Sequence, residues 1–520
     1  MSVVGAALLI SACLCFFLYV VLGFLHRVIW QPFWTQRILA AQGIKGPAYC
    51  FLLGNAKELI RLRNQALEKP MTALSHDISH RILPYVSVWA NNYGRNFAFW
   101  IGPRAQLVVT EPEKIKEILC NRYTNFPKAE LYSFYLKKIF GQGLLISEGE
   151  QWSKVRTLTV SAFHGISLKG MMADMVASVE MMLERWKEKE GAEVEIYEEL
   201  RTLTSEVISR TAFGSSFEEG KQIFGMLHKM MALAETNMYT IRLPFISNIF
   251  KTVDEMEAER LDQGIADSII DIVKKREEKV KCQQDVDSNG YGSDYLGLLI
   301  QAHHDEDETK KISMEQLIDE CRTLYAAGQE TANAALSWMI LLLAIHQDWQ
   351  EKVRNEVISI FGHEKCLDFD GIARLKITGM FILETLRLYT PVYTGFIRDI
   401  GKEATLGKLT GLDGVQCHIP FIMIHHDPKI WGEDVHAFKP ERFLDGIAKA
   451  TNNNPTAFMP FGMGHHMCAG SNFAINEAKI TIAMILQRYS LTLSPGYVHA
   501  PHPGLTLRPA YGIQIILNAL

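Results

Sequence analysis

The first 25 residues contain no charged side chain, and this run limits what the N-terminus can form. They are mostly Val, Leu, Ile, Ala, Phe and Cys. As a helix that rises about 1.5 Å per residue, they would reach roughly 35 Å, enough to cross a hydrocarbon core of about 30 Å. We therefore predict a transmembrane anchor over residues 1–25.

The residues that follow this run indicate its orientation. Residues 26–57 contain no acid and four basic side chains, Arg27, Arg37, Lys45 and Lys57. Basic flanks lie on the cytoplasmic side, and Trp30 and Trp34 would lie near the membrane interface. The alternative, a cleaved signal peptide, would have a charged start, a shorter apolar core and a small-residue cleavage site, and none of these is clear. We therefore expect a single-pass protein whose main part is cytoplasmic.

Charge and cysteine content exclude several classes of protein. Lys and Arg number 53 against 58 Asp and Glu, a net charge of −5. A slightly acidic chain argues against broad nucleic-acid binding, which needs a basic surface, so no nucleic-acid partner is expected. The nine cysteines include Cys13 and Cys15 in the anchor, and no CxxC pair occurs. This pattern matches neither a disulfide framework nor a zinc site.

Helical periodicity dominates the rest of the chain. Ser313 and Gln316 form a predicted capping box that opens an apolar-periodic helix to about His346. Apolar side chains also recur at helical spacing over 168–186, which we interpret as core packing. Strand-like pieces are few, at 97–101, 106–110 and 513–517. We predict a mainly α fold with a minor β part, a basic Gly/Pro hinge over 26–58 and one domain over 59–520.

The stretch Phe461–Gly470 is the most informative part of the chain. A helix is predicted from about Ser471, so Cys468 lies at or just before a helix N-terminus, where partial positive charge favours a thiolate. Gly464 and Gly470 leave room for backbone N–H groups and a flat ligand near the sulfur, and Phe461 can shield it. A shielded thiolate suits a soft iron centre, although a lone cysteine is more commonly an inert core residue.

Glu384 and Arg387 lie three residues apart on a predicted helix and can form an ion pair. The neighbouring side chains are apolar, which indicates that the pair is buried: Phe381, Ile382, Leu383, Leu386 and Leu388. A buried pair needs further partners, and Arg442 is the candidate. The alternative is an exposed pair that contributes a few tenths of a kcal/mol.

Small residues interrupt the long helix at Ala326–Gly328, directly before Glu330 and Thr331. Glycine within a helix costs about 1 kcal/mol relative to alanine, so this position suggests a place where a ligand meets the backbone. Thr331 could bond a small bound molecule instead of its own i−4 carbonyl, and Glu330 could relay protons. A surface Glu-Thr pair is the alternative.

Taken together, these motifs resemble the cytochrome P450 family over essentially the whole chain. Four occur in the family's order: Trp152-x-x-x-Arg156, AGxET at 327–331, ExxR at 384–387 with PERF at 440–443, and FxxGxxxCxG at 461–470. Residues 43–58, 425–432 and 457–462 are similar to plant clan 72 of the family.

The resemblance implies a cytochrome P450 fold behind one N-terminal transmembrane helix, with haem b as cofactor. It makes Cys468 the axial thiolate and the only metal ligand from the chain. It places Trp152, Arg156 and Arg398 at the haem propionates. It also implies a buried structural triad of Glu384, Arg387 and Arg442, and an acid–alcohol pair, Glu330 and Thr331, that supplies protons for dioxygen activation.

The activity implied is that of a membrane-anchored haem-thiolate monooxygenase. It would insert one oxygen atom from O₂ into an apolar organic substrate, terpenoid, steroid-like or another plant specialised metabolite. Electrons would come from an NADPH-cytochrome P450 reductase at the endoplasmic reticulum membrane. Substrate contacts would come from about 128–146, 213–250, 325–331 and 392–396.

The chain departs from the family pattern at His466, where an arginine is usual. Arginine offers a permanent charge and a bidentate fork to a propionate, whereas histidine is shorter and mostly neutral near pH 7. We expect Arg156 and Arg398 to keep haem seated, with His466 as a weaker third partner. Two alternatives stay open: a haem-thiolate isomerase or dehydratase that needs no external electrons, and a degenerate, non-catalytic paralogue.

Overall fold

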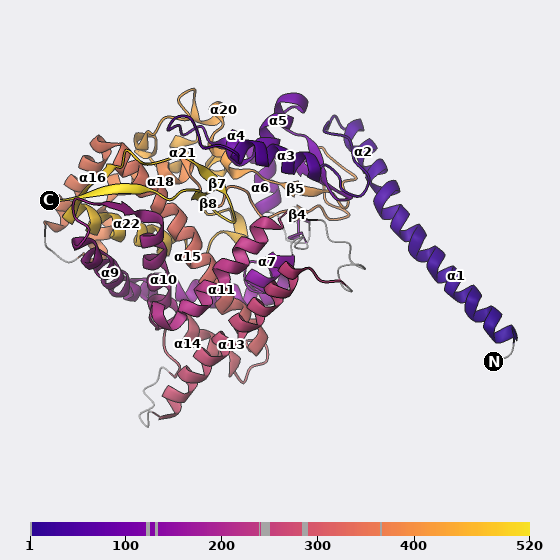
Figure 1. Ribbon diagram of the computed structural model, residues 1–520, viewed down its shortest axis with the longest axis horizontal. Helices are drawn as coiled ribbons and strands as arrows, with labels where there is room; N and C mark the ends of the chain where they lie inside the picture. The colour runs from indigo at the N-terminus through magenta and orange to yellow at the C-terminus, as the bar shows by residue number, and fades with distance from the viewer. Residues whose placement is uncertain are drawn as a thin grey trace.

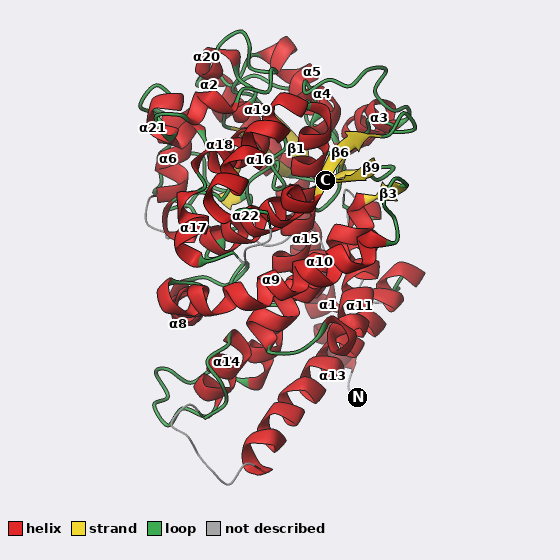
Figure 2. Cartoon of the chain, turned by 90° about the vertical axis from the view of Figure 1, so that its left-hand side faces the viewer, coloured by secondary structure: helices red, strands yellow, loops and turns green. Residues whose placement is uncertain are grey.

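The computed structural model describes residues 3–120, 125–129, 134–238, 240, 250–282, 290–363 and 367–520. Helices make up most of the molecule, as Figure 2 shows. The predicted mainly α fold with a minor β part is confirmed. Residues 282–294 are rich in Asp, Ser, Gly and Gln, a composition that predicts a surface loop, and much of this segment lies outside the described residues.

An apolar helix extends from the body of the molecule at the N-terminus (Figure 1). Helix α1 (Val3–Leu25) continues through a π-helical turn, η1 (His26–Trp30), into α2 (Gln31–Ala41). The π turn directly precedes Pro32, which has no N–H to donate to the turn before it. A helix long and apolar enough to cross a membrane runs from Leu9 to Ala41, past the end of α1 at Leu25, and the anchor bounds of 1–25 stay a prediction.

Eleven further helices lie between this N-terminal segment and the centre of the fold among the described residues. They are α3 (Ala56–Leu67), α4 (Ser79–Ile82), α5 (Pro84–Tyr93), α6 (Pro112–Cys120), α7 (Phe134–Phe140), α8 (Gly149–Ala162), α9 (Gly165–Lys187), α10 (Ile196–Phe213), α11 (Phe217–Thr236), α13 (Val253–Cys282) and α14 (Tyr295–His303). The apolar side chains that we predicted to pack in the core over 168–186 lie on α9. They are buried, with Met171 among them, whereas Met172 is half-buried.

The long helix α15 (Met314–Ile345) lies near the centre of the fold (Figure 1). Its predicted capping box is present: the Ser313 hydroxyl accepts from the Gln316 N–H, and the Gln316 side chain accepts from the Ser313 N–H. It packs against α7, α10, α13 and α18. The helices after it are α16 (Gln347–Phe361), α17 (Phe369–Arg374), α18 (Lys376–Leu388), α19 (Phe421–His425), α20 (Pro428–Trp431), α21 (Ile447–Ala450) and α22 (Ser471–Arg488), with 3₁₀ turns η2 (Pro440–Phe443), η3 (Pro455–Ala457) and η4 (Gly464–His466).

Three small sheets complete the described fold. A four-stranded sheet has the order β1-β2-β5-β4, a three-stranded one β3-β9-β6, and β7 pairs with β8. The strands are β1 (Ala98–Ile101), β2 (Arg104–Val108), β3 (Glu193–Glu195), β4 (Arg398–Asp399), β5 (Gln416–His418), β6 (Tyr489–Leu493), β7 (Pro501–Pro503), β8 (Leu507–Pro509) and β9 (Gln514–Ala519). All three predicted strand segments are therefore strands, with ends shifted by at most two residues.

Candidate active site

Cys468 lies on a short loop between η4 and α22. The loop closes on itself, because the Cys468 N–H donates to the Phe461 carbonyl at 2.9 Å. Helix α22 begins at Ser471 with Gly470 as its N-cap, so the sulfur lies just before a helix N-terminus, as predicted. The Cys468 side chain is exposed, which leaves the sulfur accessible to a ligand.

The environment of the sulfur raises the pKa of the Cys468 thiol, contrary to the expectation that the helix end alone would favour the thiolate. Desolvation of the sulfur by the protein atoms around it has the largest effect and raises the pKa, whereas the Gly470 N–H and the Arg156 guanidinium lower it. A thiol in such surroundings becomes a thiolate when a metal replaces its proton.

Two glycines flank Cys468 for different reasons. Gly464 has φ +71°, and a Cβ there would lie 2.2 Å from the Leu119 carbonyl oxygen, so the loop can pack on the end of α6 only with glycine. No described atom lies within 4 Å of a Cβ placed on Gly470. The open space that we predicted beside the sulfur therefore lies at Gly470.

Basic side chains gather around this loop from distant parts of the chain. Arg156 comes from α8, Arg398 from β4, and Lys128 from a segment bridged to Arg398. His466 stacks at an angle on Trp152, with ring centroids 4.4 Å apart. Burial and the charges of Lys128, Arg398 and Arg156 lower the pKa of His466 to about 3, so this ring is neutral, as expected.

This basic cluster is short of negative charge. Glu148 is its acidic partner, 3.4 Å from the Arg398 guanidinium, and it also accepts from the Lys128 N–H at 2.6 Å. Burial, followed by Arg398, lowers the pKa of Lys128 to about 7. The buried Nε of Arg398 has no hydrogen-bond partner among the described residues. A buried donor without a partner is costly, so a ligand bearing carboxylates fits this cluster.

The predicted structural triad is present, with Glu384 and Arg387 buried and Arg442 14% exposed. Glu384 and Arg387 on α18 form a two-pronged ion pair, with Nε–Oε2 at 2.7 Å and Nη2–Oε1 at 2.8 Å, and both side chains have no exposed surface. Arg442 lies 3.5 Å from Glu384 and donates to the Trp431 carbonyl. The Lys439 N–H also donates to Glu384 at 2.9 Å. The triad thus fixes the segment that leads to the Cys468 loop.

Glu330 and Thr331 lie on α15 but do not point at one common partner. The buried Glu330 accepts from the Thr506 hydroxyl at 2.8 Å, and burial raises the pKa of Glu330. The Thr331 hydroxyl donates to the Ala327 carbonyl at 2.7 Å, the i−4 bond that we expected it to forgo. Thr331 must rotate from this bond before it can contact a bound molecule.

Gly328 has a packing role that the sequence did not reveal. A Cβ at this position would lie 2.7 Å from the Ile208 side chain on α10. Helices α10 and α15 can therefore approach closely only because residue 328 lacks a side chain. Helix packing is thus one reason for a glycine at this position, and the expected contact of the backbone with a ligand stays a prediction.

The family model for cytochrome P450 matches residues 71–517 of this chain. The chain belongs to the cytochrome P450 family. Cytochrome P450 CYP749A22 of Panax ginseng is 48% identical over 98% of this chain and 97% of its own length. Cytochrome P450 CYP72A616 of Paris polyphylla is 38% identical over 94% of both chains, in line with the clan 72 resemblance. The 11-oxo-beta-amyrin 30-oxidase of Glycyrrhiza uralensis is 38% identical over 95% of this chain and 94% of its own.

As a cytochrome P450, this protein is an oxidoreductase whose family carries haem b with a cysteine thiolate as the axial ligand. The family also implies a redox partner and a hydrophobic substrate. The basic cluster beside the exposed Cys468 has the chemistry to hold such a group, with its two propionates at the cations.

Sequence reasoning missed three residues of this P450 site. Lys128 lies in the loop before Trp152, where we expected substrate contacts, and Glu148 lies next to that loop. Thr506 lies between β7 and β8. None of them belongs to a motif, and each meets its partner across many residues of chain. Residues 130–133, 239 and 241–249, parts of the expected substrate regions, lie outside the described residues.

Glu477 on α22 gives this P450 a predictable pH dependence. It is 2% exposed, burial raises its pKa to about 8, and its Oε1 has no hydrogen-bond partner among the described residues. Between about pH 4.5 and 8 the folded state keeps a proton that the unfolded state has lost, so the free energy of unfolding falls as pH rises. We expect Glu477→Gln to make this slope less steep in chemical unfolding measured from pH 5 to 9, while Glu320, whose pKa burial also raises to about 8, keeps its share. An equal slope in both proteins would contradict the assignment.

Proposed function

We propose that this P450 is a membrane-anchored monooxygenase of an apolar plant specialised metabolite, with a terpenoid as the first class to test. The observation that supports this proposal is the exposed Cys468, which lies beside a cluster of basic side chains with too few acidic side chains to balance their charge. The relative named for oxidation of 11-oxo-beta-amyrin supports the terpenoid class. The apolar Leu9–Ala41 helix, with exposed Trp30 and Trp34, supports anchoring in the endoplasmic reticulum membrane.

Each site residue has a place in this proposal. Cys468 would ligate the haem iron, with Phe461, Gly464 and Gly470 shaping its loop. Arg156, Arg398, Lys128 and Trp152 would hold the propionates, and His466 would contribute as a neutral ring. The Glu384–Arg387–Arg442 triad would keep the loop in place. When bound, haem supplies the activation of dioxygen, from which one oxygen atom enters the substrate and the other leaves as water.

Glu330 and Thr331 are the candidates for supplying protons to the reaction. Glu330 is buried and accepts a hydrogen bond from the Thr506 hydroxyl, and burial raises its pKa, which favours the protonated form relative to an exposed glutamate. Thr331 lies one residue further along α15, and its hydroxyl would become free to bond a bound molecule once it leaves the Ala327 carbonyl. This retained pair favours oxygen chemistry over the alternative isomerase or dehydratase, neither of which needs it.

Turnover experiments test the proposal directly. Purified protein, an NADPH-cytochrome P450 reductase and terpenoid extracts should give products that are one oxygen atom heavier by mass spectrometry, only when NADPH is present. Conversion without NADPH and reductase would favour the isomerase or dehydratase. A reduced, carbon monoxide-treated protein that is folded but lacks the thiolate-type Soret band would favour the degenerate paralogue.

His466→Arg tests how the propionates are held. Because Arg156 and Arg398 already supply charge, we expect haem occupancy of the wild type to be high and to rise only slightly in the variant. Occupancy is read from the ratio of Soret to protein absorbance after gel filtration. A haem-free wild type together with a fully loaded variant would show that His466 impairs binding and that the two arginines do not suffice.

A further inference from the structure

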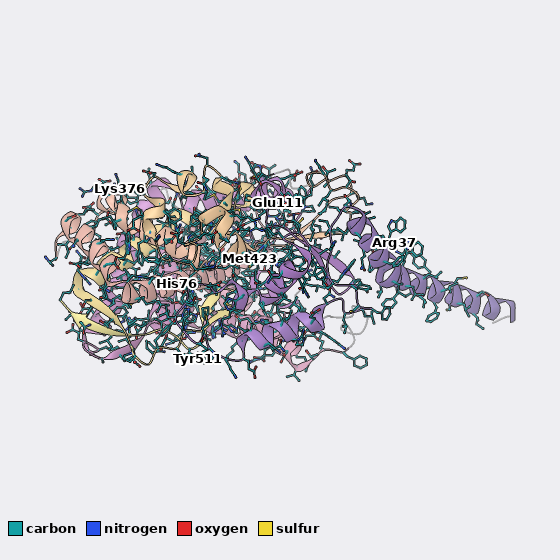
Figure 3. The ribbon with its side chains drawn as sticks, turned by 90° about the horizontal axis from the view of Figure 1, so that it is seen from above. Arg37, His76, Glu111, Lys376, Met423 and Tyr511 are labelled. Carbon is teal, nitrogen blue, oxygen red and sulfur yellow. The ribbon has the colours of Figure 1, made fainter. Side chains whose placement is uncertain are left out.

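Three side chains that no motif joins meet on the face of the molecule near α4. Asp77 lies just before α4, His426 just after α19, and His436 in the loop between α20 and η2. One possible ligand atom from each lies within 4.8 Å of the other two. Figure 3 labels His76 and Met423, which mark the first two of these segments. Residues 77, 426 and 436, here called the Asp-His-His cluster, thus converge from three loops.

A backbone hydrogen bond determines which nitrogen of the His426 ring carries the proton. Its Nε2 lies 3.0 Å from the Leu388 carbonyl oxygen, which can only accept, so Nε2 carries the proton. Burial and the Arg387 guanidinium keep the pKa of His426 well below its usual range, so the ring is neutral. The lone pair of Nδ1 therefore remains, and this buried atom has no partner in the described part of the chain. An imidazole that donates its other N–H to a carbonyl is the usual arrangement of a metal-bound histidine.

His436 and Asp77, the other two members of the cluster, are partly exposed, so an ion can reach them from solvent. The side chain of His436 is 36% exposed and that of Asp77 is 48% exposed, and their Nε2 and Oδ1 atoms lie 3.7 Å apart. The two imidazole rings have centroids 5.3 Å apart. The Nδ1 atom of His80 lies 3.6 Å from the same Asp77 oxygen, so a fourth donor is at hand.

An ordinary surface ion pair does not account for this arrangement. An Asp–His pair needs one imidazole, whereas a second ring, 5% exposed, brings a possible ligand nitrogen within 4.8 Å of the same two groups. Buried polar atoms without partners are rare and costly, so the lone pair of His426 calls for a ligand. A positive ion satisfies that lone pair and the Asp77 carboxylate together.

We propose that the Asp-His-His cluster binds a divalent transition-metal ion, with zinc as the expected occupant. Two imidazole nitrogens and one carboxylate oxygen form a donor set that suits zinc, and a water or His80 would complete four-coordination. Magnesium and calcium prefer oxygen donors and should not bind. The ion would join the segment before α4 to the loops around the buried triad, apart from the haem.

The test uses the full-length, haem-loaded protein without a histidine tag, in detergent and stripped of loose metal by a chelator. Titration calorimetry with ZnCl₂ should give one ion per chain. Asp77→Asn and His436→Ala should each weaken zinc binding by at least about tenfold, because each removes a ligand. Both side chains are partly exposed, so these variants should keep the thermal unfolding midpoint of the metal-free wild type.

His304→Ala is the matched control. His304 is exposed and its Nε2 lies 2.8 Å from Glu277, so it forms a comparable histidine–carboxylate pair outside the cluster. Zinc should bind this variant as it binds the wild type, and should raise the unfolding midpoint of both but not of Asp77→Asn. The proposal is overturned if the wild type takes up no zinc, if all three variants bind equally, or if MgCl₂ binds as tightly as ZnCl₂.

Discussion

Cys468→Ser is expected to abolish the thiolate-type Soret band of the reduced, carbon monoxide-treated protein. Turnover should fall by at least about three orders of magnitude, because a serine hydroxyl does not supply the electron density that a thiolate gives to iron. The fold should survive, since the loop is closed by the Cys468 N–H and the Phe461 carbonyl, and serine keeps this backbone bond. The spectrum and the product yield are measured on the same preparation.

Cys282→Ser is the control for this experiment. Cys282 is exposed at the end of α13, far along the chain from the candidate site. We expect it to leave both the Soret band and the turnover unchanged. If Cys468→Ser retained the thiolate-type band, another cysteine would be the ligand and the proposed site would be wrong.

Local sequence rules predicted the parts of the site that local geometry determines. The helix start after Cys468, the capping box at Ser313 and the paired spacing of Glu384 and Arg387 each depend on residues a few positions apart. The structure confirms them for that reason. The packing role of Gly328 could not be predicted because its neighbour Ile208 lies 120 positions away, on another helix.

Long-range pairing decides the remaining features. Lys128 meets Arg398 through a bridge between segments that are distant in sequence, and Thr506 reaches Glu330 from the C-terminal hairpin. Neither pairing has a periodic pattern or a motif that a sequence could show. The same holds for Asp77 and His436, whose proximity depends on how three loops pack.

Glu384→Ala is expected to destabilise the protein by about 3–5 kcal/mol, because it leaves the buried Arg387 guanidinium without its carboxylate. This is a large share of the roughly 5–15 kcal/mol that stabilises a typical fold. Arg442 and the Lys439 N–H lose the same acceptor. The midpoint of guanidinium unfolding, followed by circular dichroism, measures the loss, and haem retention should fall with it.

The same chain contains a second Glu-x-x-Arg pair that isolates the effect of burial. On α13, Arg260 donates to Glu257 through two bonds of 2.8 and 2.7 Å, much as Arg387 does to Glu384, but this pair faces solvent. Water solvates the remaining arginine when Glu257 is replaced, so Glu257→Ala should leave the unfolding midpoint unchanged. Spacing alone therefore does not decide how much an ion pair contributes to stability. The apolar residues around Glu384 decide it, because they exclude the water that would otherwise solvate Arg387. Equal shifts in the two variants would contradict this explanation.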